Sequence, residues 1–245
     1  MRSAKAVWRL LQVLLHILHG LWTIWRVFPR LSQQERDARA QVWAKALLNK
    51  LSIELVVRGV PADGPVLLVA NHISWLDIVA MQAVRHCRFI SKSDVRHWPL
   101  VGMLAAGAGT LFIERASRRD AMRVVHQMAD QLRAGDVLAV FPEGTTGDGT
   151  QVLPFHANLL QAAISVNVPV QPVALGFADG VTGQASLVPC YIGDDTLVQS
   201  LWRTACTDRL QAIVQYGQSQ TAQGRDRRTW AEDLRQAVVA LRQTS

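Results

Sequence analysis

The stretch VLLVANHISWLDIVAM, residues 66–81, joins two kinds of sequence pattern. Val66 to Ala70 is a continuous apolar run, which is typical of a strand buried on both faces of a sheet. From Trp75 onward the apolar side chains recur at helical spacing, and Ser74 with Asp77 forms an S-x-x-D helix-start signature. The stretch therefore predicts a buried strand that leads through a short polar turn into a helix.

The same alternation of short β-branched runs and helical stretches continues outward in both directions. The expected strands are residues 53–57, 66–70, 88–90, 110–113, 137–141, 168–175 and 186–188, and the expected helices between them are 75–84, 99–106, 118–132 and 156–166. Nearer the C-terminus, residues 196–215 and 229–242 are helical in pattern. This alternation predicts an α/β domain with a mixed, largely parallel central sheet flanked by helices.

Residues 1–51 differ from the rest of the 245-residue chain in charge and hydropathy. Residues 1–50 hold nine Lys or Arg side chains and two acidic ones, so they account for the whole net charge of +7. The uncharged run Leu10 to Trp25 inside them is too apolar for a nucleic-acid-binding arm and favours an anionic membrane as the partner. We expect residues 1–51 to form a helical membrane anchor and residues 52–245 to form the α/β domain.

The anchor's apolar run of 16 residues is shorter than the ~20 that a perpendicular span needs. Three tryptophans lie near its ends, where amphipathic rings favour the headgroup layer. This favours a helix that lies in or dips into one leaflet; a true span and a helix packed on the domain's own core are the alternatives. A second basic helix, about residues 32–51, would lie along the same surface. No small-residue cleavage site follows, so we expect the anchor to be retained.

The three cysteines, Cys87, Cys190 and Cys206, are odd in number and have no metal-type spacing. They therefore form neither a paired disulfide framework nor a zinc motif. A reducing, cytoplasm-facing compartment fits this usage best, and no metal site is predicted.

The turn after the first buried strand has two interpretations. A helix start explains Ser74 and Asp77, but not Asn71 and His72, a polar pair at the carboxyl end of a strand. In the second interpretation His72 donates Nδ1–H to Asp77 and keeps Nε2 as a base, like the first two members of a hydrolytic triad. No G-x-S-x-G elbow occurs in the sequence and no cysteine lies near the motif, so the activated hydroxyl would belong to the substrate.

Polar residues also follow two other expected strands. Arg115 comes after residues 110–113, and an arginine fork there suits a phosphate or carboxylate group. Glu143, Gly144 and Thr145 come after residues 137–141, and glycine lets a ligand approach the backbone closely. Strand ends of one sheet converge, so we expect these side chains to meet His72 at one crevice.

Four motifs together resemble the glycerolipid acyltransferase family, and most closely its lysophosphatidic acid acyltransferase branch. They are Asn71-His72-x4-Asp77, Gly109 to Arg115, Phe141 to Thr145 and Val168 to Val173, in the family's order and approximate spacing. The resemblance covers about residues 53–175, and it implies the fold of a glycerol-3-phosphate acyltransferase.

The resemblance also implies residue roles. His72 would be the general base, Asp77 would orient it, and Arg115 would help to bind the acceptor's phosphate. The other expected substrate-binding residues are Asn71, Lys92, Glu143, Gly144 and Thr145. The donor would be a thioester, acyl-CoA or acyl carrier protein, used as a co-substrate with no cofactor. The expected reaction acylates the sn-2 hydroxyl of 1-acyl-glycerol-3-phosphate to phosphatidic acid at the cytoplasmic face of a membrane.

One segment departs from the branch. Residues 146–150 read TGDGT, where members acting on lysophosphatidic acid usually carry an arginine. The tract is similar to that of the lyso-ornithine lipid acyltransferase branch, so that acceptor is the alternative. A non-catalytic membrane-binding module and a hydrolase that activates water with the same His-Asp pair are the competing function classes.

Overall fold

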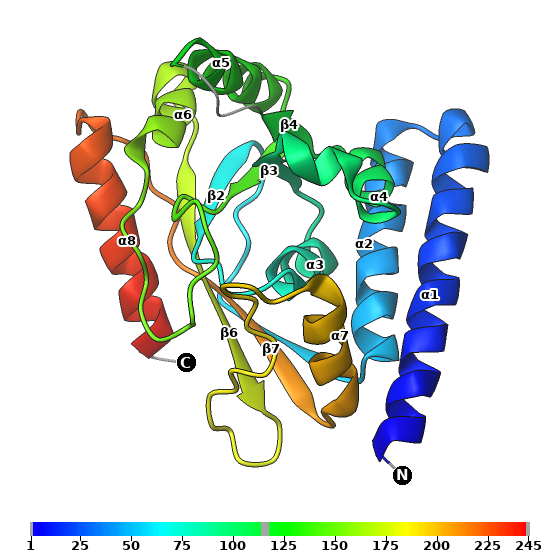
Figure 1. Ribbon diagram of the computed structural model, residues 1–245. Helices are drawn as coiled ribbons and strands as arrows, with labels where there is room; N and C mark the ends of the chain where they lie inside the picture. Colours follow the sequence, from blue (N-terminus) through cyan, green and yellow to red (C-terminus); the bar gives the residue numbers. More distant parts are fainter. Residues whose placement is uncertain (1, 114–117, 244–245) are drawn as a thin grey trace.

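The protein is described by a computed structural model that covers residues 2–113 and 118–243. Within these residues a seven-stranded sheet has the order β1-β7-β6-β2-β5-β3-β4 (Figure 1). Its strands are β1 (Ile53–Arg58), β2 (Val66–Ala70), β3 (Arg88–Lys92), β4 (Leu111–Ile113), β5 (Val137–Val140), β6 (Val170–Asp179) and β7 (Leu210–Tyr216). The predicted α/β fold with a mixed, largely parallel sheet is confirmed.

Five of the strands run in one direction. β6, β2, β5, β3 and β4 pair in parallel with their neighbours, whereas β7 is antiparallel to β6 and parallel to β1. The carboxyl ends of β2, β5 and β3 therefore lie along the same edge of the sheet, which is where the chain changes from apolar strand to polar turn.

Helices cover both faces of the sheet (Figure 1). They are α3 (Leu76–Val84), α4 (Val101–Gly107), α5 (Arg118–Arg133), α6 (Leu160–Val166), α7 (Leu197–Cys206) and α8 (Arg227–Gln243), with short 3-10 turns at Phe28–Arg30, Ser93–His97 and Ala157–Leu159. Successive β2 side chains enter different cores: Leu68 packs with residues of α3, and Leu67 packs with residues of α5, α6 and α8. Because both faces of β2 are buried, its sequence is an unbroken apolar run.

The N-terminal residues form two helices, α1 (Arg2–Arg26) and α2 (Gln33–Lys50). α2 begins with a capping box between Ser32 and Glu35 and buries Leu47 and Leu48 in the core beside α3. α1 lies against α2, α4 and α7. Arg9 ties α1 to the end of α7, because its guanidinium donates to the backbone oxygens of Ala205 and Thr207 at 2.8 and 2.9 Å and pairs with Asp208.

The face of α1 away from the domain is apolar and exposed. Its side chains, each at least 45% exposed, are Val7, Trp8, Leu11, Leu14, Leu15, Leu18, Trp22 and Trp25. Among the described residues, Ser3–Arg30 is the one helical segment long and apolar enough to cross a membrane, by length and composition. The packed face carries Ala6 and Val13, both buried.

Two expected elements are wrong. Residues 196–215 are not one helix: α7 ends at Cys206, and β7 follows, with Leu210, Ala212, Val214 and Tyr216 buried alternately as the period of a strand requires. Residues 186–188 do not form a strand. Ser186 donates one backbone hydrogen bond to Phe177, Leu187 is 57% exposed, and Pro189 has no N–H to continue a ladder.

Candidate active site

The turn between β2 and α3 is built around the carboxylate of Asp77. Its Oδ2 accepts three hydrogen bonds: from His72 Nδ1 at 2.9 Å, from the Ile73 N–H at 2.6 Å and from the Ser74 N–H at 2.8 Å. The side chain is fully buried. The contact between His72 and Asp77 that the sequence predicts is present, and the carboxylate also satisfies two amides at the start of α3.

The imidazole of His72 is held in one orientation. Because a carboxylate accepts hydrogen bonds, Nδ1 carries the proton and Nε2 has a free lone pair. Within the described residues Nε2 has no hydrogen-bond partner, and the side chain is 17% exposed, so solvent or substrate reaches it. The ring stacks on Phe141 with 3.9 Å between centroids and 8° between planes. The pair therefore presents a fixed acceptor nitrogen at the edge of the sheet.

The helix start differs by one residue from the expected cap. α3 begins at Leu76 with Trp75 at the N-cap, and Ser74 lies one position earlier. Ser74 Oγ accepts from the Leu76 N–H at 3.3 Å, so it still satisfies an amide of the first turn. Asp77 reaches back to the Ser74 N–H, as the capping signature predicts.

Glu143 joins the turn after β5 to the turn after β2. Its Oε1 accepts the His72 N–H at 2.7 Å and its Oε2 accepts the Leu153 N–H at 2.7 Å. The residue is 5% exposed, and burial raises the pKa of its carboxyl above the usual range although both N–H donors oppose the shift. Gly144, with φ of +76°, turns the chain where a side chain would strain the backbone. The carboxylate thus holds the backbone that carries the imidazole.

Asn71 joins β2 to β6. Its Nδ2 donates to the Leu175 oxygen at 3.0 Å, and its Oδ1 accepts the Leu175 N–H at 2.8 Å. The side chain is buried, and both of its polar atoms are used in this contact. Asn71 therefore fixes the end of β2 just before His72.

Two other predicted site residues, Lys92 and Thr145, are exposed. Lys92 is at the carboxyl end of β3, and Thr145 is beside Gly144. Arg115 lies outside the described residues. The structure thus brings together Asn71, His72, Asp77 and Glu143, and among the described contacts it records none between Lys92 and this group.

Several contacts that support the turn were not predicted. The Gly147 N–H donates to the His72 oxygen at 2.8 Å, and the Tyr191 N–H donates to the Ile73 oxygen at 3.0 Å. Trp75 Nε1 donates to Ser200 Oγ at 3.1 Å, which ties the start of α3 to α7. Each partner is far away in the sequence, so no local pattern could have indicated it.

Comparisons with known proteins indicate the family. The family model described as Acyltransferase matches residues 54–176, half of the chain. A Pseudomonas aeruginosa lyso-ornithine lipid O-acyltransferase is 40% identical over 83% of this chain and 78% of its own length. A Neisseria gonorrhoeae 1-acyl-sn-glycerol-3-phosphate acyltransferase is 36% identical over 85% of this chain and 82% of its own length.

The fold also has a solved counterpart. The crystal structure of a 1-acyl-sn-glycerophosphate acyltransferase from Thermotoga maritima superposes with a TM-score of 0.71 over 99% of this chain and 98% of that chain, at 21% identity. The family-model match, the relatives and the His72–Asp77 geometry lead to one conclusion: the chain belongs to the acyltransferase family.

Proposed function

We propose that the protein transfers an acyl chain from a thioester donor, acyl-CoA or acyl carrier protein, to a hydroxyl of a lysolipid. The observation that carries the proposal is the 2.9 Å contact between His72 Nδ1 and Asp77 Oδ2, with Nε2 left as an accessible base. The names of the relatives support acyl transfer as the class of reaction.

The chemistry follows from the orientation of the imidazole. Nε2 removes the proton of the lysolipid hydroxyl while its oxygen attacks the thioester carbonyl carbon. The carbon–sulfur bond then breaks, and the thiolate takes the proton back from the imidazolium. Asp77 stabilises the imidazolium and keeps the proton on Nδ1. A thiolate is a good leaving group, so the chain's contribution is a positioned base and the alignment of two substrates.

We assign supporting roles to two residues of the motifs. Glu143 acts through the His72 N–H and Asn71 acts through Leu175, so each is a positioning residue for the base. The acceptor would lie beyond them, where Gly144, Thr145 and Lys92 occupy the strand ends.

The first candidate acceptor is 1-acyl-glycerol-3-phosphate, acylated at its sn-2 hydroxyl to give phosphatidic acid in phospholipid biosynthesis. Lys92 is an exposed cation at the same edge of the sheet as His72, and Arg115 follows β4 in the sequence. Both would attract the phosphate. The Neisseria relative carries this activity in its name.

The second candidate acceptor is lyso-ornithine lipid. Residues 141–150 contain no cation but include Asp148, which is exposed close to the turn that carries His72. A carboxylate attracts the ammonium group of ornithine, whereas it would repel the phosphate of 1-acyl-glycerol-3-phosphate. The Pseudomonas relative, at 40% identity, is named for this acceptor.

The N-terminal helices would place the site at a membrane. α1 is fixed to α7 through Arg9 on one face and exposes apolar side chains on the other. We therefore infer that α1 lies in the interface of one leaflet with its packed face still on the domain. The three unpaired thiols support the cytoplasmic face.

The deciding experiment offers both acceptors and both donors to the purified protein in detergent micelles and identifies the products by mass spectrometry. We expect acyl transfer to one lysolipid with strict dependence on the acceptor. Acyl release without any acceptor would indicate a hydrolase, and vesicle binding without turnover would indicate a membrane-binding module. Either result would overturn the proposal.

A further inference from the structure

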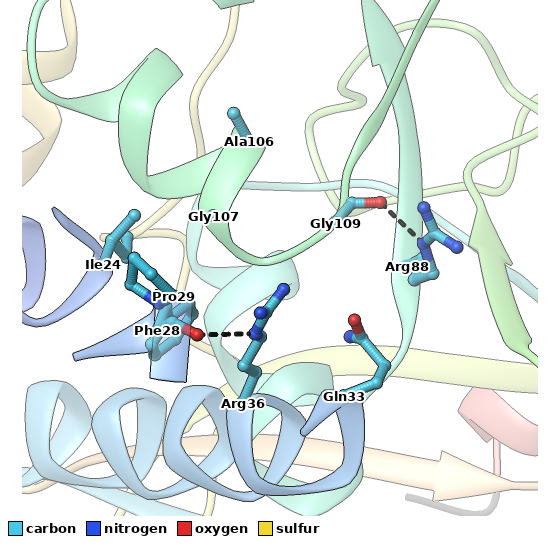
Figure 2. A pocket seen from close by; sticks show the side chains of 9 residues that line it. All are labelled: Ile24, Phe28, Pro29, Gln33, Arg36, Arg88, Ala106, Gly107 and Gly109. Atoms are coloured by element: carbon cyan, nitrogen blue, oxygen red, sulfur yellow. Dashed lines mark hydrogen bonds between the residues drawn. The ribbon is translucent and has the colours of Figure 1, made fainter. Parts of the chain in front are cut away.

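A pocket lies at the edge of the sheet opposite His72. It has a volume of about 330 Å³ and is lined by Ile24, Phe28, Pro29, Gln33, Arg36, Arg88, Ala106, Gly107 and Gly109 (Figure 2). Arg88 is the first residue of β3 and Gly109 precedes β4, whereas His72 follows the last residue of β2. Because these strands are parallel, the pocket is at their amino ends and is separate from the active site.

The pocket presents an arginine with unused donors. Arg36 Nε donates to the oxygens of Phe28 and Leu31 at 2.9 and 3.1 Å, which holds the guanidinium in place. Among the described residues its two Nη nitrogens have no hydrogen-bond partner. Figure 2 shows Arg36 and Gln33 side by side on α2, with their polar ends directed toward Gly107 and Gly109. A fixed guanidinium with two open nitrogens matches the oxygens of a phosphate.

The rest of the lining favours an anion with an apolar tail. Arg88 also lines the pocket, but its guanidinium is already used: it pairs with Asp136, donates to Gln131 and donates to the Gly109 oxygen at 2.9 Å. None of the nine lining residues is acidic; the carboxylate that contacts Gln33, that of Asp37, accepts from Gln33 Nε2 at 2.7 Å and is paired with His86. On the other side, Ile24, Phe28 and Pro29 form an apolar wall.

The pocket is also at the C-terminal end of α1, where aromatic and basic side chains would meet lipid headgroups. Ile24 and Phe28 belong to that end, where Trp22 and Trp25 are 53% and 74% exposed and Arg26 and Arg30 are exposed cations. Tryptophan and basic side chains together favour the interface of an anionic membrane.

From this placement we propose that the pocket binds the phosphodiester headgroup of one anionic phospholipid. The phosphate sits on the Arg36 guanidinium, and the glycerol and upper acyl chains lie along Ile24 and Phe28. The bound lipid is neither acceptor nor product. It holds α1 and α2 at a fixed depth in the membrane, and the reaction takes place at His72, at the opposite edge of the sheet. This goes beyond the proposed function, because it concerns a second lipid site with its own ligand.

The test measures binding to vesicles of phosphatidylcholine with and without phosphatidylglycerol, by flotation of the full chain. Gln33→Glu places a negative charge in the pocket and leaves Arg36 and its backbone contacts in place; it also removes the hydrogen bond that Gln33 Nε2 donates to Asp37 Oδ1 at 2.7 Å, so its result is interpreted together with that of the arginine pair. Gln34→Glu adds the same charge at the neighbouring exposed position outside the pocket and is the matched control. Arg36→Gln and Arg39→Gln form a second pair on the same helix, with Arg39 exposed and outside the lining.

We expect the two control variants to weaken binding to phosphatidylglycerol vesicles by about fivefold, the effect of one charge near an anionic surface. The two pocket variants should lose about tenfold or more, because a charge-assisted contact to the phosphate is also lost. Binding to pure phosphatidylcholine should be equal for all five proteins. Equal losses within each pair would overturn the proposal.

A soluble competitor separates a lipid from a free phosphate. Short-chain phosphatidylglycerol should displace the protein from vesicles at much lower concentration than inorganic phosphate does, because it also fills the apolar wall. Equal competition by the two would overturn the assignment to a lipid. Acyl transfer is not measured in either assay, so failure of this proposal leaves the proposed function untouched, and the reverse also holds.

Discussion

The two halves of the candidate active site differ in how they are held. The half around the base is buried: Asp77 and Glu143 together accept five hydrogen bonds, four of them from backbone amides. The half expected to bind the acceptor, Lys92 and Thr145, is exposed at the ends of other strands. The orientation of the His72 imidazole is thus built into the fold, whereas we expect the acceptor contacts to be completed only when the lipid binds.

Removing the base should give the largest effect. With His72→Ala the hydroxyl has no proton acceptor, so we expect kcat to fall by ~10² to 10⁴. The unfolding free energy should fall by about 1–3 kcal/mol, because buried Asp77 loses one hydrogen-bond donor and Phe141 loses its stacking partner, so activity is compared at a temperature where both proteins are folded. His126→Ala, at an exposed position on α5, is the control and should keep full activity. A residual rate within tenfold of the original protein would contradict the assignment of the base.

Asp77→Asn tests whether the negative charge of Asp77 contributes to activity in addition to the orientation that it gives the His72 ring. The amide oxygen retains acceptor capacity, but the negative charge is lost, and an NH₂ group enters the position of Oδ1, which has no partner. We expect kcat to fall by about 10²-fold or more. A buried unpaired donor should cost about 1–3 kcal/mol of unfolding free energy. A stability loss with kcat unchanged would show that Asp77 is only a helix cap.

Glu143→Ala separates a positioning residue from an acceptor contact. Without the carboxylate, the N–H groups of His72 and Leu153 are left unpaired, at about 1–3 kcal/mol each in unfolding free energy. A positioning role predicts a lower kcat with the KM for the lysolipid unchanged, and partial recovery in Glu143→Gln, which keeps one acceptor oxygen. A raised KM with kcat unchanged would instead place the carboxylate against the acceptor.

The exposed half should respond weakly and selectively. Lys92→Gln removes one solvated cation, a change of roughly 0.2–1 kcal/mol. We therefore expect the KM for 1-acyl-glycerol-3-phosphate to rise a few-fold and kcat to stay the same. Lys45→Gln, an exposed cation on α2, is the matched control. If lyso-ornithine lipid is the acceptor, neither variant should change its KM.

Thiol labelling of the unchanged protein reports whether the buried residues around His72 become accessible to solvent. Burial raises the pKa of Cys87 to about 12, and burial also raises the pKa of Cys190, whose Sγ lies 3.5 Å from the Asp148 oxygen. We expect an Ellman assay of the native protein to label Cys206, which is half-buried, and the other two only after unfolding. Rapid labelling of Cys190 would show that the segment covering the turn is open.

The parts of this site that sequence could predict are the local ones. His72 and Asp77 are five positions apart in a strand-to-helix turn, so their contact follows from the capping pattern and the apolar run before it. Glu143 and Leu175 are 71 and 104 residues away from their partners in that turn. Their roles depend on which strands become neighbours, and residue types alone do not specify that order.

The missed strand has a similar cause. Leu210 to Tyr216 alternates in burial but not in hydropathy, because Ala212, Ile213 and Val214 are consecutive apolar residues, and it follows an amphipathic helix without a glycine or proline to separate them. Its identity as a strand depends on its position between β1 and β6, where both edges are paired. Pairing with both neighbouring strands therefore decides the structure of these residues, although the local pattern predicts one continuous helix.

The sheet order has a consequence for the timing of folding. β1 pairs only with β7 within the described sheet, so the first strand waits for residues 210–216; α1 contacts α2 and α4 as well as α7, and of these contacts only those with α7 wait for residues 197–206. During synthesis the N-terminal helix emerges long before those partners exist. We therefore expect the part of α1 that contacts α7 to be uncovered in the nascent chain, so that contact with a bilayer or a chaperone can precede completion of the α/β domain.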